Sequence, residues 1–510
     1  MFLLLGLTLG LTLLSLFCYY RRHDRAAIGA LMGAGLSLRL VMATVDPFLH
    51  DFDEKYHALV AKNMLADWTT PILRLHPVLP YNYQTWCCNH IWVHKQPLFL
   101  WQMTLSMHLF GVSELAVRLP SVLLTTLLIW PVYRIGKLAY NRAAGYFTAL
   151  LLVFAQYQLE LISGGQSVDH SDIAFLFYIT ASIWAYVESQ QPGARVWRWS
   201  LLAGLLAGAA TLCKWLPGLV VYAGWGLTLL STPARRRQPA EYLRLGASGL
   251  VALAVFLPWQ LYIHHRFPVE SAYEQQFSAI HFWKAVEGQG GPWYFYFRNL
   301  FYQYQWLLPF IVGGLVLALR RPRPALRPLL LICAVVFLFF SAAATKMPSY
   351  TYIVSPLLLL LVGIVCAESE QHLLGSGTRA ATVGWTLLLL LIVLLNLRPD
   401  ALLKHHTLRF AKSSRTFREQ KLQHTAVYRQ LDALVPPGYV VFNTTALEDV
   451  EAMFYSSRNV YSWWPTEAEY RSLRARGIRL ATFPDHGQQV LPAYMRGPDV
   501  LVIKAPLQSW

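Results

Sequence analysis

Charged residues are scarce in this chain. They make up 14% of its 510 residues, whereas an ordinary soluble protein carries about 25%. Hydrophobic residues reach 55%, and about twelve apolar runs approach the ~20 residues that a membrane-spanning helix needs. The sequence therefore predicts a polytopic α-helical membrane protein with about 12–13 transmembrane helices. The runs are 2–20, 26–45, 115–137, 143–160, 173–188, 199–213, 215–232, 246–263, 304–319, 328–344, 350–367 and 379–397.

Three other signals are absent. No basic n-region precedes the first apolar run, MFLLLGL, and no small-residue cleavage site follows it, so we expect a retained helix rather than a signal peptide. No convincing internal repeat is present, which disfavours a secondary transporter built on inverted halves. The six cysteines lie mostly in or near the apolar runs and imply no disulfide framework.

The net charge of +16 comes largely from short basic loops. Loops rich in Lys and Arg resist translocation and stay cytoplasmic, so they predict a membrane topology rather than a nucleic-acid partner. The intervening loops, the N-terminus and the C-terminal tail should then share the outer face, where we expect the chemistry. The basic loops lie at 21–25, 134–142, 195–198, 235–244 and 320–327.

The outer segments comprise two long loops and a tail. Loop 46–114 contains a helical pattern and an apolar stretch at 97–111, which we expect to be a helix along the membrane interface. Loop 264–303 is rich in Trp and Tyr, which settle at the membrane–water boundary. From about residue 398, the strand patterns YVVFN, RLATF and VLVIKA alternate with helical VYRQLDALV, EDVEAMFY and EAEYRSLRARG, which predicts a small α/β domain.

Acidic residues lie at the outer ends of two spans. Asp53 and Glu54 follow one apolar run, and Asp169 and Asp172 precede another in SVDHSDIAF. A lone acid in such a place could simply cap the helix that follows. Acids at the mouth of a membrane bundle are costly unless they are paired or functional, so these four are candidates for chemistry.

Basic residues on the same face complement these acids. Lys95, Lys214, Arg266 and Lys346 each lie at the outer end of a span or interfacial helix. A single Lys there could be snorkelling toward water. Four cations beside external acids suggest a binding site for an anionic leaving group next to a general base.

Histidines raise the question of a cofactor. His94, His264 and His265 could bind a divalent metal, although their spacing matches no closed zinc signature. A divalent metal is therefore the one cofactor that the sequence admits, and the sequence does not establish it.

Several stretches, in order along residues 26–400, resemble the glycosyltransferase-C superfamily, in particular its protein O-mannosyltransferases and lipid A aminoarabinose transferases. The resemblance implies an inverting transferase that moves a sugar from a polyprenyl-phosphate carrier to a lipid, glycan or protein acceptor. The transfer would take place on the non-cytoplasmic face of a bacterial inner membrane. The stretches are DFDEKYHALVAKNM, HKQPLFLW, HSDIAFLFY, CKWLPGL, PWQLYIHHRFP and TKMPSYTYIVSP.

The resemblance also implies residue roles. Asp53 matches the first family acid, which activates or orients the acceptor, with Glu54 beside it, and Asp172 matches the second. The family's EKPP motif has an acid before its Lys. In this chain, His94 takes the place of that acid and Gln96 takes the place of the first proline. A metal site that used the acid would therefore lack one ligand. The positions expected to bind the carrier phosphate are Lys95, Arg266 and Lys346. Further candidates for substrate binding are Asp169, Lys214, Tyr350 and His265.

We therefore expect three domains. Residues 1–25 form an extra membrane helix and a basic loop, and 26–397 form the transmembrane catalytic domain. Loops 46–114 and 264–303 form its active site. Residues 398–510 form an extracytoplasmic α/β domain.

A transporter or flippase for a lipid-linked sugar is the main alternative, because its cavity needs similar cations. A transporter should place ionisable residues in mid-span and on both faces, whereas the candidates here lie at outer ends, which favours the enzyme. A non-catalytic assembly subunit with the same fold is the third hypothesis. Loss of Asp53 without any effect on activity would support it.

Overall fold

The protein folds as two compact units. The computed structural model describes residues 1–85, 88–166, 168, 170–375, 377–399, 414–484, 490–505 and 507. The membrane unit comprises Met1–Ala43, Pro120–Ser163 and His170–Leu402. The loop–tail unit comprises Thr44–Leu119, Gly164–Asp169 and Leu403–Trp510. Loop 46–114 and the C-terminal tail therefore share one unit, although the composition of the chain changes near residue 398.

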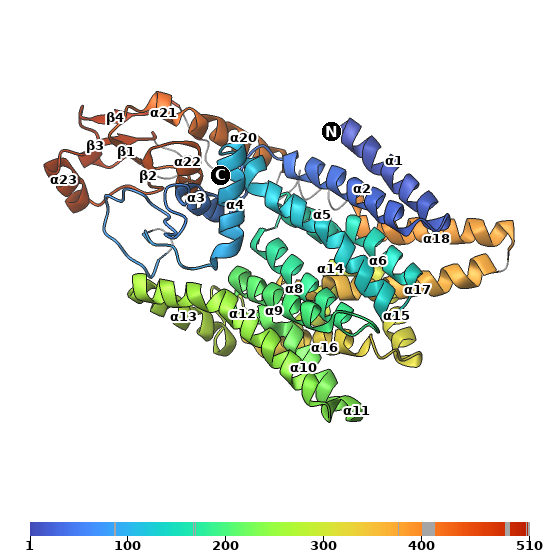
Figure 1. The fold of residues 1–510 in the computed structure, drawn as a ribbon. Helices are drawn as coiled ribbons and strands as arrows, with labels where there is room; N and C mark the ends of the chain where they lie inside the picture. Colours follow the sequence, from blue (N-terminus) through green and yellow to red (C-terminus); the bar gives the residue numbers. More distant parts are fainter. Residues whose placement is uncertain are drawn as a thin grey trace. The chain divides into compact units, whose positions relative to one another are not determined.

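Every apolar run of the sequence forms helix, as Figure 1 shows. The predicted fold class, a polytopic helical membrane protein with a small C-terminal sheet, is confirmed. The helices are α1 (Phe2–Tyr20), α2 (Asp24–Thr44), α5 (Glu114–Ala139), α6 (Arg142–Val153), α7 (Gln156–Ile162), α8 (His170–Ser189), α9 (Val196–Lys214), η1 (Leu216–Leu219), α10 (Val220–Ser231), α11 (Pro233–Arg236), α12 (Pro239–Arg266), α13 (Pro268–Trp283), α14 (Phe295–Tyr304), η2 (Gln305–Leu307), α15 (Leu308–Arg320), α16 (Arg327–Ala342), η3 (Tyr350–Val354), α17 (Ser355–Gly375) and α18 (Arg379–Leu397).

Fewer of the described helices than the predicted 12–13 have the length and hydropathy of a membrane span. Eight helices of the described chain are long and apolar enough to cross a membrane, or nine if α6 and α7, bent by 44°, form one broken span. The runs at 215–232 and 328–344 form shorter apolar helices, Leu216–Ser231 and Arg327–Ala342. An apolar run requires burial away from water, but it does not require a helix of full membrane length, because a shorter one can be buried in the bundle.

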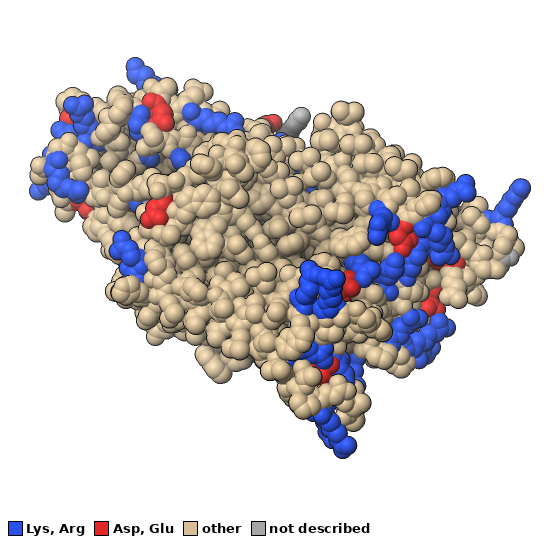
Figure 2. All heavy atoms as spheres, in the orientation of Figure 1, with Lys and Arg blue, Asp and Glu red and all other residues tan. Residues whose placement is uncertain are grey.

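Basic side chains gather at one end of the membrane unit, as Figure 2 shows over α11 and the ends of α5 and α15. Some of them pair with acids at that end. Arg134 lies 2.6 Å from Glu188, and Lys137 lies 2.9 Å from Asp24. The basic loops that the sequence groups together thus lie at one end of this unit.

The tail forms a parallel sheet in the order β2-β1-β3-β4. Its hydrophobic core includes Phe442, Tyr461, Leu480 and Met495, together with Leu79 from loop 46–114. Part of this loop is therefore built into the core of the tail. The strands are β1 (Tyr439–Phe442), β2 (Asn459–Val460), β3 (Arg479–Thr482) and β4 (Val500–Val502).

Helix α3 (Asp53–Asn63) connects the first loop to the tail, because it packs against both α4 and α22. Two acids in its first turn and Lys62 in its last turn complement the helix dipole. The predicted helix at 97–111 is confirmed as α4. The other helices of this unit are α4 (Pro97–Phe110), α20 (Ser414–Arg429), α21 (Leu431–Leu434), α22 (Asp449–Tyr455), α23 (Glu467–Ala475) and η4 (Ala493–Met495).

Candidate active site

Asp53 is the first residue of α3. Its Oδ2 lies 3.8 Å from Nζ of Lys95, and the two side chains are 19% and 23% exposed. This separation exceeds that of a charge-assisted hydrogen bond, so the ammonium supplies a nearby positive charge without holding the carboxylate tightly. The preceding residue, Phe52, has φ +67°, a conformation that costs energy for a bulky side chain. Strain of this kind is often found at functional sites.

Glu54 is placed very differently from its neighbour. It is 1% exposed, and Arg118 donates hydrogen bonds to both of its carboxylate oxygens, with Nε 2.7 Å from Oε1 and Nη2 3.0 Å from Oε2. The same guanidinium donates to the backbone oxygens of Asp46 and Phe48. This arrangement gives Glu54 a structural role in holding the turn before α3. A carboxylate with both oxygens bonded to Arg118 differs from the catalytic group expected at Glu54 from the sequence.

Gly164 leaves room for this ion pair. An added Cβ would lie 2.4 Å from Oε2 of Glu54, and the residue has φ +74°. We expect Gly164→Ala to destabilise the protein by about 1–3 kcal/mol through backbone strain and to displace Glu54 further. Gly438→Ala is the matched control, because it has φ +83° and no atom within 4 Å of an added Cβ. Thermal unfolding should show a larger loss for Gly164→Ala, and equal losses would contradict the packing argument.

A second carboxylate–ammonium pair lies in the membrane unit. Asp172, in the first turn of α8, accepts a 2.6 Å hydrogen bond from Nζ of Lys214, the last residue of α9. The Asp172 side chain is 3% exposed. The ring of Tyr350 lies 5.7 Å from the same ammonium, and Trp215, next in the chain, has φ +67°. The structure thus brings together three of the predicted residues here.

The two predicted phosphate ligands in the membrane unit, Lys346 and Arg266, differ in their exposure to solvent. Lys346 is 3% exposed, and its Nζ donates to the backbone oxygens of Phe340, Ser341 and Ala343 at the end of α16. Burial lowers its pKa below the ordinary value. Its ammonium thus caps a helix, which differs from the phosphate contact expected from the sequence. Arg266, at the end of α12, is exposed.

The three histidines considered as metal ligands lie in two different units, His94 in the loop–tail unit and His264 and His265 in the membrane unit. His264 and His265 are exposed in the last turn of α12, and His94 is half-buried with its ring 5.7 Å from that of Trp92. Within the described ranges, no group of three or more His, Cys, Asp and Glu side chains could hold a metal ion. Asp169 lies outside the described residues.

Two buried cations of the loop–tail unit, Arg118 and Lys421, are not among the residues predicted from the sequence. Arg118 is fully buried within the apolar stretch ELAVRLPSVLL. A charged residue inside such a stretch is energetically costly unless it is paired, so the position of Arg118 in the sequence predicts a buried acidic partner. Lys421 of the tail pairs with Glu448 and Glu451, which also belong to the tail.

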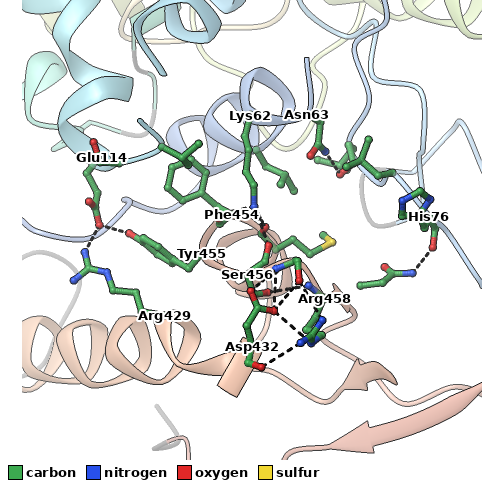
Figure 3. A pocket seen from close by; sticks show the side chains of 18 residues that line it. Lys62, Asn63, His76, Glu114, Arg429, Asp432, Phe454, Tyr455, Ser456 and Arg458 are labelled. Carbon is green, nitrogen blue, oxygen red and sulfur yellow. Dashed lines mark hydrogen bonds and ion pairs between the residues drawn. The ribbon is translucent and has the colours of Figure 1, made fainter. Parts of the chain in front are cut away.

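A cleft of about 850 Å³ lies in the loop–tail unit, lined by residues of α3, α20, α22 and β2 (Figure 3). Its charged side chains interact mainly with one another. Arg429 pairs with Glu114, Arg458 lies 3.3 Å from Asp432, and Lys62 donates to backbone oxygens. The cleft therefore shows chiefly how the loop is fastened to the tail.

Comparisons with known proteins find similarity to mannosyltransferases and to arabinosyl transferases. A family model described as dolichyl-phosphate-mannose-protein mannosyltransferase matches residues 94–262. An undecaprenyl phosphate-alpha-4-amino-4-deoxy-L-arabinose arabinosyl transferase 1 from Sodalis glossinidius (strain morsitans) is 30% identical over 335 residues, covering 62% of this chain and 55% of the relative. The similarly named transferase of Pseudomonas aeruginosa (strain LESB58) is 28% identical over 371 residues, covering 69% and 61%.

The fold is also that of a solved member of this group. The crystal structure of ArnT from Cupriavidus metallidurans bound to undecaprenyl phosphate matches with a TM-score of 0.62 and 18% identity, over 87% of each chain. The aligned part spans between 44% and 64% of the length of curated relatives. The predicted resemblance to protein mannosyltransferases and aminoarabinose transferases is confirmed in sequence and in fold.

Proposed function

We propose that the protein is an inverting glycosyltransferase that moves a sugar from a polyprenyl-phosphate carrier to an envelope acceptor. The acceptor is a lipid, a glycan or a protein on the non-cytoplasmic face of the bacterial inner membrane. The observation that carries this proposal is the carboxylate–ammonium pair at the start of α3, in a chain with the fold of ArnT bound to undecaprenyl phosphate. The names of the relatives support an undecaprenyl-phosphate pentose donor.

Asp53 is the proposed general base. Its carboxylate takes the proton of the acceptor hydroxyl as the acceptor oxygen attacks the anomeric carbon of the sugar. The bond from that carbon to the carrier phosphate breaks, and the phosphate leaves with the electron pair. A single displacement of this kind inverts the anomeric configuration. If the acceptor is itself a phosphate, no proton has to be removed and Asp53 orients the acceptor instead.

Cations stabilise the departing phosphate in this proposal. Lys95 and Arg266 are the proposed phosphate ligands, because the ammonium of Lys346 is already bonded to three backbone oxygens. Asp172 and Lys214 are proposed to contribute to substrate binding together with Tyr350. No step of this mechanism requires a metal ion.

Arg266 offers a direct check of phosphate binding. A hydrogen bond to a charged group contributes about 1.5–3 kcal/mol, so Arg266→Ala should raise the KM for the lipid-linked donor about tenfold or more. The matched control is Arg298→Ala, because Arg298 is also exposed and also lies over a phenylalanine ring. The guanidinium carbon of Arg298 is 5.9 Å from the ring centre of Phe295, and that of Arg266 is 5.4 Å from the ring centre of Phe267. Steady-state kinetics over a donor titration gives both values, and an equal change in the two variants would argue against a phosphate contact.

A transport assay separates the enzyme from a flippase. The parent protein is reconstituted into liposomes that contain a lipid-linked sugar, with and without an envelope extract as acceptor. The proposal expects sugar to appear on the acceptor and free carrier phosphate to accumulate. Movement of intact lipid-linked sugar across the bilayer without any transfer would instead support the flippase.

A further inference from the structure

A buried ion network joins the first loop to the tail within the loop–tail unit. Its centre is Lys421 of α20, whose side chain is 0% exposed. Its ammonium lies 2.5 Å from Glu451 Oε2 and 3.3 Å from Glu448 Oε1, both on the tail, and 3.6 Å from Asp51 Oδ1 in the loop. The ammonium of Lys55 lies 3.0 Å from the same Asp51 oxygen. The network therefore ties the start of α3 to the tail.

Other polar side chains of α20 complete the network. Thr425 donates a 2.7 Å hydrogen bond to Oε1 of Glu451, and Tyr428 donates a 2.6 Å hydrogen bond to Oε2 of Glu448. Nδ1 of His424 lies 2.8 Å from that same Glu448 oxygen. Both carboxylates thus have hydrogen-bond partners on each of their oxygens, as a buried charge requires.

Opposite charges in this network stabilise each other, whereas burial and the neighbouring Glu448 raise the pKa of Glu451 above its ordinary value. Burial opposes the charged form of Lys421, yet Glu451, Glu448 and Asp51 raise its pKa above the ordinary value. Burial likewise acts to raise the pKa of Asp51, but Lys55 and Lys421 hold it well below its usual range. Removal of one member would leave an uncompensated buried charge, so the network depends on all of its parts.

The other end of α3 is fastened to the tail as well. Lys62, in its last turn, donates hydrogen bonds of 2.7, 2.8 and 2.8 Å to the backbone oxygens of Met453, Phe454 and Ser456. These oxygens lie at the end of α22, where carbonyls lack partners within the helix. Figure 3 shows Lys62 pointing toward this end. Helix α3 is thus attached to the tail at both ends.

We propose that the tail positions the catalytic helix, with Lys421 and Lys62 acting as positioning residues for Asp53. The role of Asp53 rests on the proposed function. Asp53 lies between Asp51 and Lys55, so a shift of this turn moves its carboxylate relative to Lys95. A misplacement of about 1 Å can cost a rate factor of about 100. The tail is therefore part of the catalytic apparatus, even though none of its residues is assigned to the chemistry.

Lys421→Met in the full-length protein tests this proposal. The expected kcat for sugar transfer falls about 100-fold, while the KM for the donor stays within about twofold of the parent value. Hydrogen exchange of the α3 amides should rise in the same variant. The matched control is Arg471→Met, which breaks an exposed ion pair with Glu467 on α23 and should change neither quantity.

Two further variants separate positioning from a general loss of folding. Lys421→Met combined with Glu451→Met removes the carboxylate nearest to the lost ammonium and should recover at least tenfold of the lost kcat. Lys62→Met leaves the buried network intact and should still lower kcat, so it carries the test if Lys421→Met does not fold. The proposal is overturned if kcat and the hydrogen exchange of the α3 amides both stay at the parent values. This outcome would have to hold in Lys62→Met and in folded Lys421→Met.

The same experiment keeps the two proposals apart. If the parent transfers no sugar from any donor while α3 exchange still rises in Lys421→Met, the proposed function fails and the attachment of α3 by the tail stands. If the parent is active and the variants keep its kcat, the positioning role fails and the proposed function stands.

Discussion

Asp53→Asn should lower the kcat for sugar transfer about 1000-fold, within the range of about 100- to 10000-fold that a general base contributes. Asn keeps the shape of the side chain but cannot accept the proton of the acceptor hydroxyl. The KM for the donor should change little, because the carrier phosphate is assigned to cations rather than to this carboxylate. Initial rates with purified protein in detergent, over donor and acceptor titrations, provide both constants.

Asp67→Asn is the matched control for this substitution. It makes the same chemical change in the same unit, at an exposed residue whose carboxylate accepts hydrogen bonds from the hydroxyls of Thr69 and Thr70. It should leave kcat unchanged. A raised KM for the acceptor with nearly normal kcat in Asp53→Asn would show that Asp53 orients a phosphate acceptor. Full activity in Asp53→Asn would remove the catalytic role altogether.

The largest effect on stability is expected at Arg118. Arg118→Met leaves the carboxylate of Glu54 buried without its guanidinium, and it also removes two hydrogen bonds to the backbone oxygens of Asp46 and Phe48. Breaking a buried ion pair by removing one partner costs about 3–5 kcal/mol. Thermal unfolding of the detergent-solubilised protein should show a large fall in the midpoint temperature.

A double variant tests whether the loss at Arg118 comes from the orphaned charge. Arg118→Met combined with Glu54→Met replaces the pair by apolar groups and should be more stable than Arg118→Met alone, because no buried charge remains. If the double variant loses as much stability as the sum of the two single variants, the pair is not coupled in the way described. Glu54→Gln should also lose stability, and it should do so without the specific fall in kcat expected for Asp53→Asn.

Much of the fold follows from sequence patterns that act locally. The apolar runs all form helices, since their composition favours burial and the helix satisfies its own backbone hydrogen bonds in lipid. The strands YVVFN, RLATF and VLVIKA are confirmed as β1, β3 and β4. Strand β2 was missed, because its two residues, Asn459 and Val460, are too few to show an alternating pattern.

The parts that could not be predicted depend on contacts between distant segments. The pairing of Lys421 with Asp51 needs the tail to fold against the first loop, and neither residue carries a signal of the other in the sequence. Lys346 illustrates the same limit. Its place at the outer end of a span suggested a phosphate ligand, whereas the turn after α16 directs its ammonium onto backbone oxygens. Spacing predicts which side chains share a region, but tertiary packing decides what they bond to.

The most direct test of the proposed enzyme is transfer of radiolabelled sugar by the purified protein in detergent. A panel of polyprenyl-phosphate sugars serves as donors, an envelope extract of lipid and glycan serves as acceptor, and Asp53→Asn is assayed beside the parent. We expect the parent to move label from at least one donor to the acceptor and to release one carrier phosphate for each sugar transferred, while Asp53→Asn does so about 1000-fold more slowly. Absence of transfer from every donor by a folded parent protein would contradict the proposed function.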